Sequence, residues 1–268
     1  MAVVLEGGCR VSQMREGEPL TNGTLRIWNR IGRATGAQAI SLRVMEFAPG
    51  LSPALRNDDS DEILYLLDAG SESGDADPNE VSTARVSGWV NLLIDGQSFR
   101  GGPDTGVYLR PGETFAVDNP GPYPVIFVSA QCPDADLPPQ FVSHPTRLAG
   151  TRRSPMVRLA DRPAQPTADR WYRILVDDEL GSTQVTQFVG SIPPGRAPDH
   201  FHSYEEVLFI LRGAGRMWAG ETNTPISPGS CIYLPKGLVH CVENTGAGEL
   251  RLLGVFYPAG SPSVRYDA

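Results

Sequence analysis

The chain has 268 residues, a formal net charge of −8 and an isoelectric point of about 5.0. Hydrophobic residues make up 40% and charged residues 20% of the sequence, which is ordinary for a globular protein with a sizeable core. No basic patch stands out, which argues against nucleic acid and anionic membrane surfaces as partners.

The N-terminal residues and the cysteines bear on the location of the protein. The opening sequence MAVVLEGGCR has an apolar run that is too short for the core of a signal peptide, and no later stretch approaches the length of a membrane span. The four cysteines are scattered, with no Cys-x-x-Cys pair, and we expect them to be reduced thiols. These features predict a cytoplasmic protein.

Short apolar runs broken by glycine and proline recur along the chain. The sequence contains 29 Gly and 24 Pro, and no segment keeps a helical period over several turns. The runs are rich in Val, Ile, Leu, Phe and Tyr, and they predict strands, for example at Ala39–Phe47, Gly106–Leu109, Thr183–Ile192 and Cys231–Leu234. Many short strands joined by turns indicate an all-β sandwich or barrel.

The sequence also contains an internal repeat. YLRPGETFAVDNPG (108–121) aligns without a gap with YLPKGLVHCVENTG (233–246). Two shorter pairs of blocks are also similar, FAPGLSP with IPPGRAP and EILYLLDAG with EVLFILRG. Two homologous all-β units follow, and we place them at 1–143 and 170–268. The segment 144–169, rich in Pro, Arg and Ala, is predicted to be a linker.

Three of the four histidines fall in two short blocks of the second unit. His200 and His202 are one residue apart, so they share a face only if this segment is extended. Glu206 lies at even spacing from both, and His240 follows a Pro-x-Gly turn. Three imidazoles and a carboxylate suit a borderline transition metal, whereas calcium and magnesium prefer more oxygen ligands. A lone histidine is usually structural, but this concentration favours a metal site.

The two blocks resemble the motifs of the cupin superfamily, and the chain resembles a two-domain bicupin. The motif residues are Gly195, His200, His202, Glu206 and Gly213 in the first block and Gly229, Pro235, Gly237, His240 and Asn244 in the second. The first block departs from the usual spacing by one residue fewer between Gly195 and His200. The resemblance implies two tandem jelly-roll β-barrels, with one divalent transition metal per chain held by His200, His202, Glu206 and His240. Iron or manganese is favoured, and nickel, copper, cobalt and zinc stay open.

The first unit has no histidine and cannot present the same ligands. Phe115 stands at the position of His240, while Glu62 keeps the place of Glu206. Depending on the alignment frame, the His-x-His positions are taken by Leu55 and Asn57 or by Arg56 and Asp58. We therefore expect the N-terminal cupin barrel to hold no metal and to have a structural role.

Strand alternation predicts the walls of the metal cavity. Leu208 and Ile210 share the face of Glu206, and Tyr233 lies on the second-motif strand, so these three are the expected substrate contacts. Resemblance to quercetinase-like cupins implies a dioxygenase-type oxidoreductase with Glu206 as metal ligand and catalytic base. The alternatives are a non-redox Lewis-acid enzyme (an isomerase, epimerase, lyase or hydrolase acting on a sugar or hydroxy-acid) and a binding protein without turnover. We expect a small-molecule substrate and a homodimer.

Overall fold

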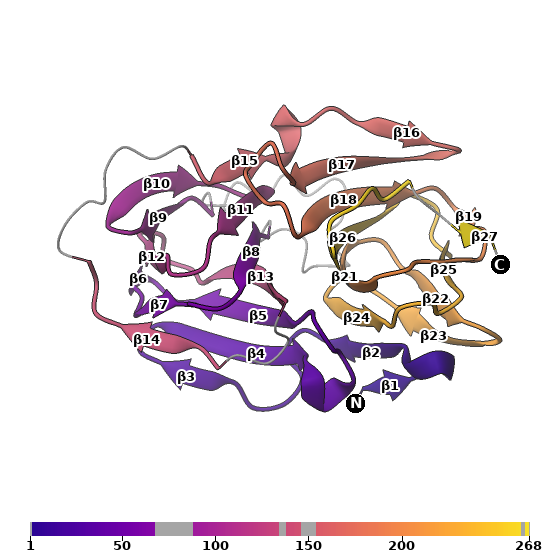
Figure 1. The fold of residues 1–268 in the computed structure, drawn as a ribbon, viewed down its shortest axis with the longest axis horizontal. Helices are drawn as coiled ribbons and strands as arrows, with labels where there is room; N and C mark the ends of the chain where they lie inside the picture. The colour runs from indigo at the N-terminus through magenta and orange to yellow at the C-terminus, as the bar shows by residue number, and fades with distance from the viewer. Residues whose placement is uncertain (1, 68–87, 134–137, 146–153, 264–265, 268) are drawn as a thin grey trace.

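The computed structural model describes residues 2–67, 88–133, 138–145, 154–263 and 266–267, which form two β-barrels lying side by side (Figure 1). The strand pairings in these residues are antiparallel, and helical structure is limited to single 3-10 turns, η1 (Glu6–Gly8), η2 (Arg33–Thr35) and η4 (Leu159–Asp161). The predicted all-β fold with two tandem jelly-roll barrels is confirmed. The alternation of apolar residues with glycine and proline explains it, because each run is long enough for a strand and too short for a packed helix.

Two sheets form the N-terminal barrel, on the left in Figure 1. The first has the order β15 (Met156–Arg158), β11 (Thr105–Leu109), β8 (Asp61–Leu66), β13 (Val125–Cys132), β5 (Leu42–Phe47), β4 (Leu25–Ile31) and β3 (Leu20–Asn22). The second has the order β10 (Gln97–Gly101), β9 (Val90–Ile94), β12 (Thr114–Asn119), β7 (Ala54–Arg56) and β14 (Gln140–Val142), with β6 (Gly50–Leu51) also paired to β12.

The C-terminal barrel repeats this arrangement. Its first sheet has the order β1 (Val3–Val4), β2 (Arg10–Gln13), β24 (Ser230–Leu234), β21 (Glu205–Arg212), β26 (Leu250–Tyr257), β18 (Thr186–Ile192), β17 (Arg170–Val176) and β16 (Gln165–Thr167). The second has the order β23 (Thr222–Ile226), β22 (Gly215–Ala219), β25 (His240–Asn244), β20 (His200–Phe201) and β27 (Tyr266–Asp267), with β19 (Gly195–Arg196) also paired to β25.

Each barrel receives a strand from outside the unit predicted for it. β2 pairs with β24, with Val11 opposite Ile232, so an N-terminal strand completes a sheet of the C-terminal barrel. β15, which lies in the predicted linker, pairs with β11 of the N-terminal barrel, with Val157 opposite Gly106. Both additions cover a strand that would otherwise be an open edge. The division at 143 and 170 stays a prediction, and these two added strands were not predicted from the sequence.

The described residues form three apolar cores, one inside each barrel and one between them. On β8, Leu64 and Leu66 pack inside the N-terminal barrel, whereas Ile63 and Tyr65 pack against the C-terminal barrel. Strand β21 is buried on both faces in the same way, because one face lines its own barrel and the other meets the neighbouring barrel. This explains why its sequence is a continuous apolar run and not an alternating one.

Two further predictions bear on thiols and membranes. All four cysteines are buried and unpaired, as expected. Among the described residues, no helix has the length and apolar character needed to cross a membrane.

Candidate metal centre

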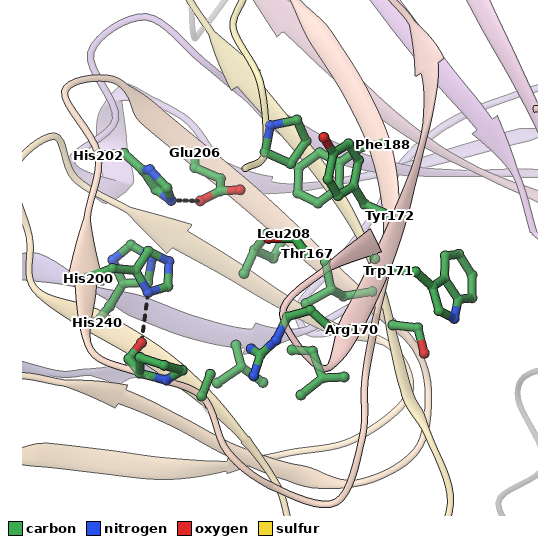
Figure 2. Close-up of a pocket in the computed structure, with 18 of the residues that line it drawn as sticks. Thr167, Arg170, Trp171, Tyr172, Phe188, His200, His202, Glu206, Leu208 and His240 are labelled. Atoms are coloured by element: carbon green, nitrogen blue, oxygen red, sulfur yellow. Dashed lines mark hydrogen bonds and ion pairs between the residues drawn. The ribbon is translucent and has the colours of Figure 1, made fainter. Parts of the chain in front are cut away.

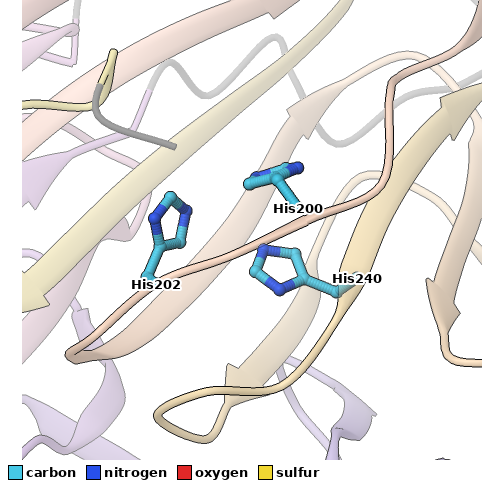
Figure 3. A group of neighbouring side chains, drawn as sticks. All are labelled: His200, His202 and His240. Carbon is cyan, nitrogen blue, oxygen red and sulfur yellow. The ribbon is translucent and has the colours of Figure 1, made fainter. Parts of the chain in front are cut away.

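The three histidines of the two sequence blocks meet inside the C-terminal barrel (Figure 3). His200 on β20 and His240 on β25 are directly opposite each other across the strand pair. His202 follows β20, and its carbonyl oxygen accepts a 2.8 Å bond from the Gly237 N–H. Gly237 has a positive φ of 77°, which a glycine adopts without strain, so the Pro-x-Gly turn brings the second block onto the first.

Two of the imidazole rings, those of His200 and His240, are oriented by backbone carbonyls. His200 Nδ1 lies 3.0 Å from the Pro198 carbonyl oxygen, and His240 Nδ1 lies 2.8 Å from the Leu238 carbonyl oxygen. A nitrogen that donates to a carbonyl carries the proton, so the Nε2 atom of each ring keeps its lone pair free for a ligand bond. This is the arrangement that metal-binding histidines use to fix their tautomer.

The geometry of the group suits a metal ion. One nitrogen from each of the three rings lies within 4.8 Å of the other two, and His202 and His240 are buried. Burial and the neighbouring His200 lower the pKa of His240 to about 3, which keeps this ring neutral, as a metal ligand must be. Imidazole donors favour transition metals over calcium and magnesium. His200, His202 and His240 therefore form a group that could hold a metal ion.

Glu206, the fourth predicted ligand, lies beside this group on β21. One carboxylate oxygen is 3.6 Å from His202 Nε2, as Figure 2 shows. The carboxyl group is buried, and the loss of solvation raises its pKa to about 8. Within the described part of the chain no Lys or Arg forms an ion pair with it. A cation bound by the histidines would therefore favour the ionised carboxylate, which burial alone disfavours.

An aromatic stack supports the group on one side. Tyr204 stacks on His202 with a centroid distance of 4.8 Å and an interplanar angle of 9°. The other face of Tyr204 stacks on Phe256 at 4.5 Å, and Phe256 in turn packs against Phe188. These three aromatic residues were not among the site residues predicted from the sequence. Tyr204 lies two residues beyond the His-x-His pair, which is the only sequence signal that could have pointed to it.

A cavity of about 120 Å³ opens from the metal centre. Leu208 lines it, as predicted, and so do His200, His202, Glu206 and His240. Further apolar walls come from Phe188, Ile192, Val242 and Leu252. The cavity also has a cationic wall residue, Arg170, which the sequence analysis missed (Figure 2).

Ile210 and Tyr233, the other predicted substrate contacts, are not among the residues that line this cavity. Ile210 lies deeper in the core of the barrel. Tyr233 faces the opposite side of β24, in the core between the barrels, because its neighbours Ile232 and Leu234 occupy the inward face. Its hydroxyl donates to the Glu205 carboxylate, which also accepts bonds from backbone N–H groups of the N-terminal barrel. Tyr233 thus joins the barrels.

Comparisons with known proteins agree with this fold. Residues 188–256, which include all four predicted ligands, match the family model described as Cupin domain. Over nearly its whole length the chain resembles solved two-barrel structures. A mutant of oxalate decarboxylase from Bacillus subtilis aligns with a TM-score of 0.71 at 14% identity, covering 93% of this chain and 77% of that one. The chain therefore has the two-barrel fold of a bicupin, with a cupin domain at residues 188–256.

The chain is also similar to proteins with other names and from other organisms. A putative glyoxylate-induced protein from Pseudomonas aeruginosa aligns with a TM-score of 0.70 at 16% identity, over 96% of this chain and 91% of that one. Auxin-binding protein 1 of Arabidopsis thaliana is 34% identical over 83 residues, which are 27% of this chain and 42% of the relative. Protein SchB of Streptomyces halstedii is 30% identical over 82 residues, 30% of this chain and 59% of the relative. The chain spans about half the length of these curated relatives.

The N-terminal barrel of the bicupin shows which residues replace the ligands. Strand pairing places Phe115 opposite Leu55, as His240 is placed opposite His200. The Gly112 N–H bonds to the Asn57 carbonyl at 2.6 Å, which repeats the bond from Gly237 to His202. The structure therefore selects Leu55 and Asn57, and not the shifted pair, as the counterparts of the His-x-His residues.

Proposed function

We propose that this bicupin is a metal-dependent enzyme acting on a small organic molecule, with one divalent transition metal held by His200, His202, His240 and Glu206. The observation that carries the proposal is the buried Glu206 carboxyl, which lies 3.6 Å from His202 Nε2 without a Lys or Arg partner in the described residues. An isolated buried charge is costly. A divalent cation would compensate it and would use the lone pairs of the imidazoles.

For the reaction we propose a dioxygenase-type oxidation of the quercetinase-like kind. A bound iron or manganese ion would supply open coordination positions and redox chemistry. The residues of the chain would bind and orient the substrate: Phe188 and Leu208 exclude water from the cavity. Glu206 would accept the proton of an enol or phenol hydroxyl at its carboxylate oxygen.

A non-redox Lewis-acid reaction on an anionic substrate is the second candidate, and Arg170 favours it. Arg170 lines the cavity, and its Nε and Nη2 atoms donate to Asp169 Oδ1 at 2.9 and 2.8 Å. Nη1 has no hydrogen-bond partner among the described residues. A guanidinium in this position would bind a carboxylate of the substrate. Oxalate decarboxylase, the structural neighbour, is named for a substrate of that chemistry.

The experiment that separates the two candidates combines metal analysis with two assays. The purified protein is analysed for transition metals, then tested for O₂ uptake with flavonols and other phenolic or enolic compounds. In parallel it is tested for O₂-independent turnover of small hydroxy-acids and dicarboxylates. O₂ uptake that requires the metal and is lost in Glu206→Gln supports the dioxygenase.

Turnover without O₂ uptake, with a lowered kcat/KM in Arg170→Gln, supports the second candidate. Metal binding without turnover in either assay contradicts an enzymatic role and leaves binding alone. Two tightly bound equivalents of metal per chain contradict the single site.

The homodimer and the cytoplasmic location stay predictions from the sequence. Light scattering coupled to size-exclusion chromatography tests the first. Fractionation of the cells that produce the protein tests the second.

A further inference from the structure

A second cavity lies at the junction between the two barrels, outside the metal centre. Its volume is about 260 Å³. We call it the junction cavity, and its lining residues are Pro103, Asp104, Arg158, Leu159, Ala160, Trp171, Arg173 and Arg251. Arg158 comes from β15, which belongs to a sheet of the N-terminal barrel, whereas Arg173 on β17 and Arg251 on β26 belong to the C-terminal barrel. Both barrels therefore contribute cations to one space.

The junction cavity is positively charged in a protein whose net charge is −8. Three arginines line it, against one carboxylate, Asp104, which accepts a 2.6 Å bond from the Tyr65 hydroxyl. Arg251 pairs with Glu249. In the described part of the chain Arg158 and Arg173 have no ion pair, and Arg173 Nη1 donates instead to the Leu159 carbonyl at 3.0 Å. Positive charge is therefore in excess around the cavity.

Aromatic rings hold the guanidinium groups in place. The Cζ atoms of Arg173 and Arg251 lie 5.4 and 5.6 Å from the ring centre of Trp171, and Arg158 Cζ lies 5.8 Å from that of Trp89. In Figure 2 the Trp171 side chain points away from the histidines, whereas the neighbouring Arg170 lies on the cavity side. Trp171 lines both the metal cavity and the junction cavity, whereas Arg170 lines the metal cavity and not the junction cavity.

Two buried arginine nitrogens at the junction cavity could donate hydrogen bonds to a bound anion. The Nε atoms of Arg173 and Arg251 are buried and have no hydrogen-bond partner among the residues that the structure describes. Arginine is the side chain best suited to phosphate, because its planar donors match the oxygens of the anion. We propose that the junction cavity binds a phosphate group, either as the free ion or as part of a small phosphomonoester, between Arg158, Arg173 and Arg251.

Such a ligand would connect the two barrels. It would contact β15, which pairs with β11 of the N-terminal barrel, and β17 and β26 of the C-terminal barrel. A ligand that binds only the folded protein raises its melting temperature in a concentration-dependent way. Phosphate is therefore expected to stabilise the protein against heat at concentrations where equal ionic strength of chloride does not.

The test uses the full-length protein, with its bound metal, and inorganic phosphate as the probe. Isothermal titration and thermal unfolding are measured against sodium chloride at matched ionic strength. We expect saturable binding that weakens by about tenfold or more in Arg158→Gln, since a charge-assisted hydrogen bond is lost. Arg100→Gln is the matched control. Arg100 Cζ lies 5.1 Å from the same Trp89 ring, but Arg100 does not line the cavity.

The outcomes are distinct. Unsaturable binding by the unmodified protein overturns the proposal, as does binding that persists in Arg158→Gln, because it then belongs to the metal centre. An equal loss in Arg158→Gln and Arg100→Gln also overturns it, since that indicates general attraction by surface charge. Glycerol 3-phosphate separates the two sources: tighter binding than phosphate indicates a phosphomonoester, and equal binding indicates the free ion.

Discussion

Each of the two barrels buries a glutamate at the equivalent position, but the groups around the two carboxylates differ. Glu62 on β8 and Glu206 on β21 hold equivalent positions, opposite Gln131 and Phe256 on the neighbouring strand. Glu62 accepts bonds from Arg43 at 2.8 Å, Ser129 at 2.7 Å and Gln131 at 3.2 Å. Among the described residues, the only charged or ionisable partner of Glu206 within 4 Å is His202, at 3.6 Å. A guanidinium compensates the first charge, and we propose that a bound metal ion compensates the second.

The residues around the two carboxylates also differ between the barrels. Arg43 is paired with Ser129 across the strands of the N-terminal barrel, and the equivalent pair in the C-terminal barrel is Phe188 with Gly254. In the N-terminal barrel Phe115 fills the place of His240, and it packs edge-on against Phe47 and Phe127 at centroid distances of 6.0 and 6.3 Å. One barrel thus has a polar network around its glutamate and an apolar centre. The other has apolar surroundings and a polar centre.

The largest expected effect is the loss of metal from the C-terminal barrel. We predict that His202→Ala lowers metal affinity by well over tenfold, because removal of even an outer-shell partner costs about 10–100-fold. Metal content of the purified variant is measured by mass spectrometry. His144→Ala is the matched control, since His144 is exposed and lies outside the centre. Full occupancy in His202→Ala would contradict the site.

The second prediction breaks the ion pair in the N-terminal barrel. Glu62→Gln leaves the Arg43 guanidinium buried without a counter-charge, and we expect the free energy of unfolding to fall by about 3 kcal/mol. Urea unfolding measures the change. Asp58→Asn removes the partner of Arg56 in an exposed pair and should cost less than about 1 kcal/mol. Equal effects of the two substitutions would show that the buried pair has no special role.

The third prediction concerns pH in the metal-free protein. Burial raises the pKa of Glu206 to about 8, so between pH 4.5 and 8 the folded state holds a proton that the unfolded state has released. Stability contributed by this group is present below pH 4.5 and falls as the pH rises to 8. His240, whose pKa is lowered to about 3, acts in the opposite direction below its ordinary value of 6.5.

Between pH 6.5 and 8, the pH dependence of stability therefore reports on Glu206 and not on His240. There the free energy of unfolding should fall by up to about 2 kcal/mol in chelator-treated protein. Urea unfolding at both pH values measures the slope. Glu206→Gln should remove this slope, and so should restoring the metal. A slope that survives the substitution would assign the effect to another group.

The smallest expected effect is a change in stability caused by substitutions in two equivalent hairpin turns. Gly23 in the β3–β4 turn and Ala168 in the β16–β17 turn have the same left-handed conformation, with φ of 55° and 53°. A side chain in this region is strained, so Ala168→Gly should stabilise the protein by about 1 kcal/mol and Gly23→Ala should destabilise it by a similar amount. Thermal unfolding of both variants measures the difference. A destabilised Ala168→Gly would show that the alanine is held by packing.

These hairpins also show where prediction from the sequence reached its limit. Leu25 follows the first turn and is buried in the N-terminal barrel, whereas Arg170 follows the second and lines the metal cavity. No sequence motif marks this equivalence, because the hairpins lie outside the repeated blocks. The ion pair between Arg43 and Glu62 was missed for a related reason. The two residues lie on β5 and β8, and their side chains meet only because the sheet places these strands on either side of β13.

The sequence by itself determined the strands, the repeat and the group of imidazoles, because these depend on local geometry. His200 and His202 share a face through strand alternation, and the Pro-x-Gly turn directs His240 toward them. Tertiary structure alone decided that Tyr233 faces the N-terminal barrel, that β2 joins the C-terminal barrel and β15 the N-terminal barrel, and that Arg170 lies at the cavity. Each of these depends on which surface covers a strand, and a covering surface comes from residues distant in the chain.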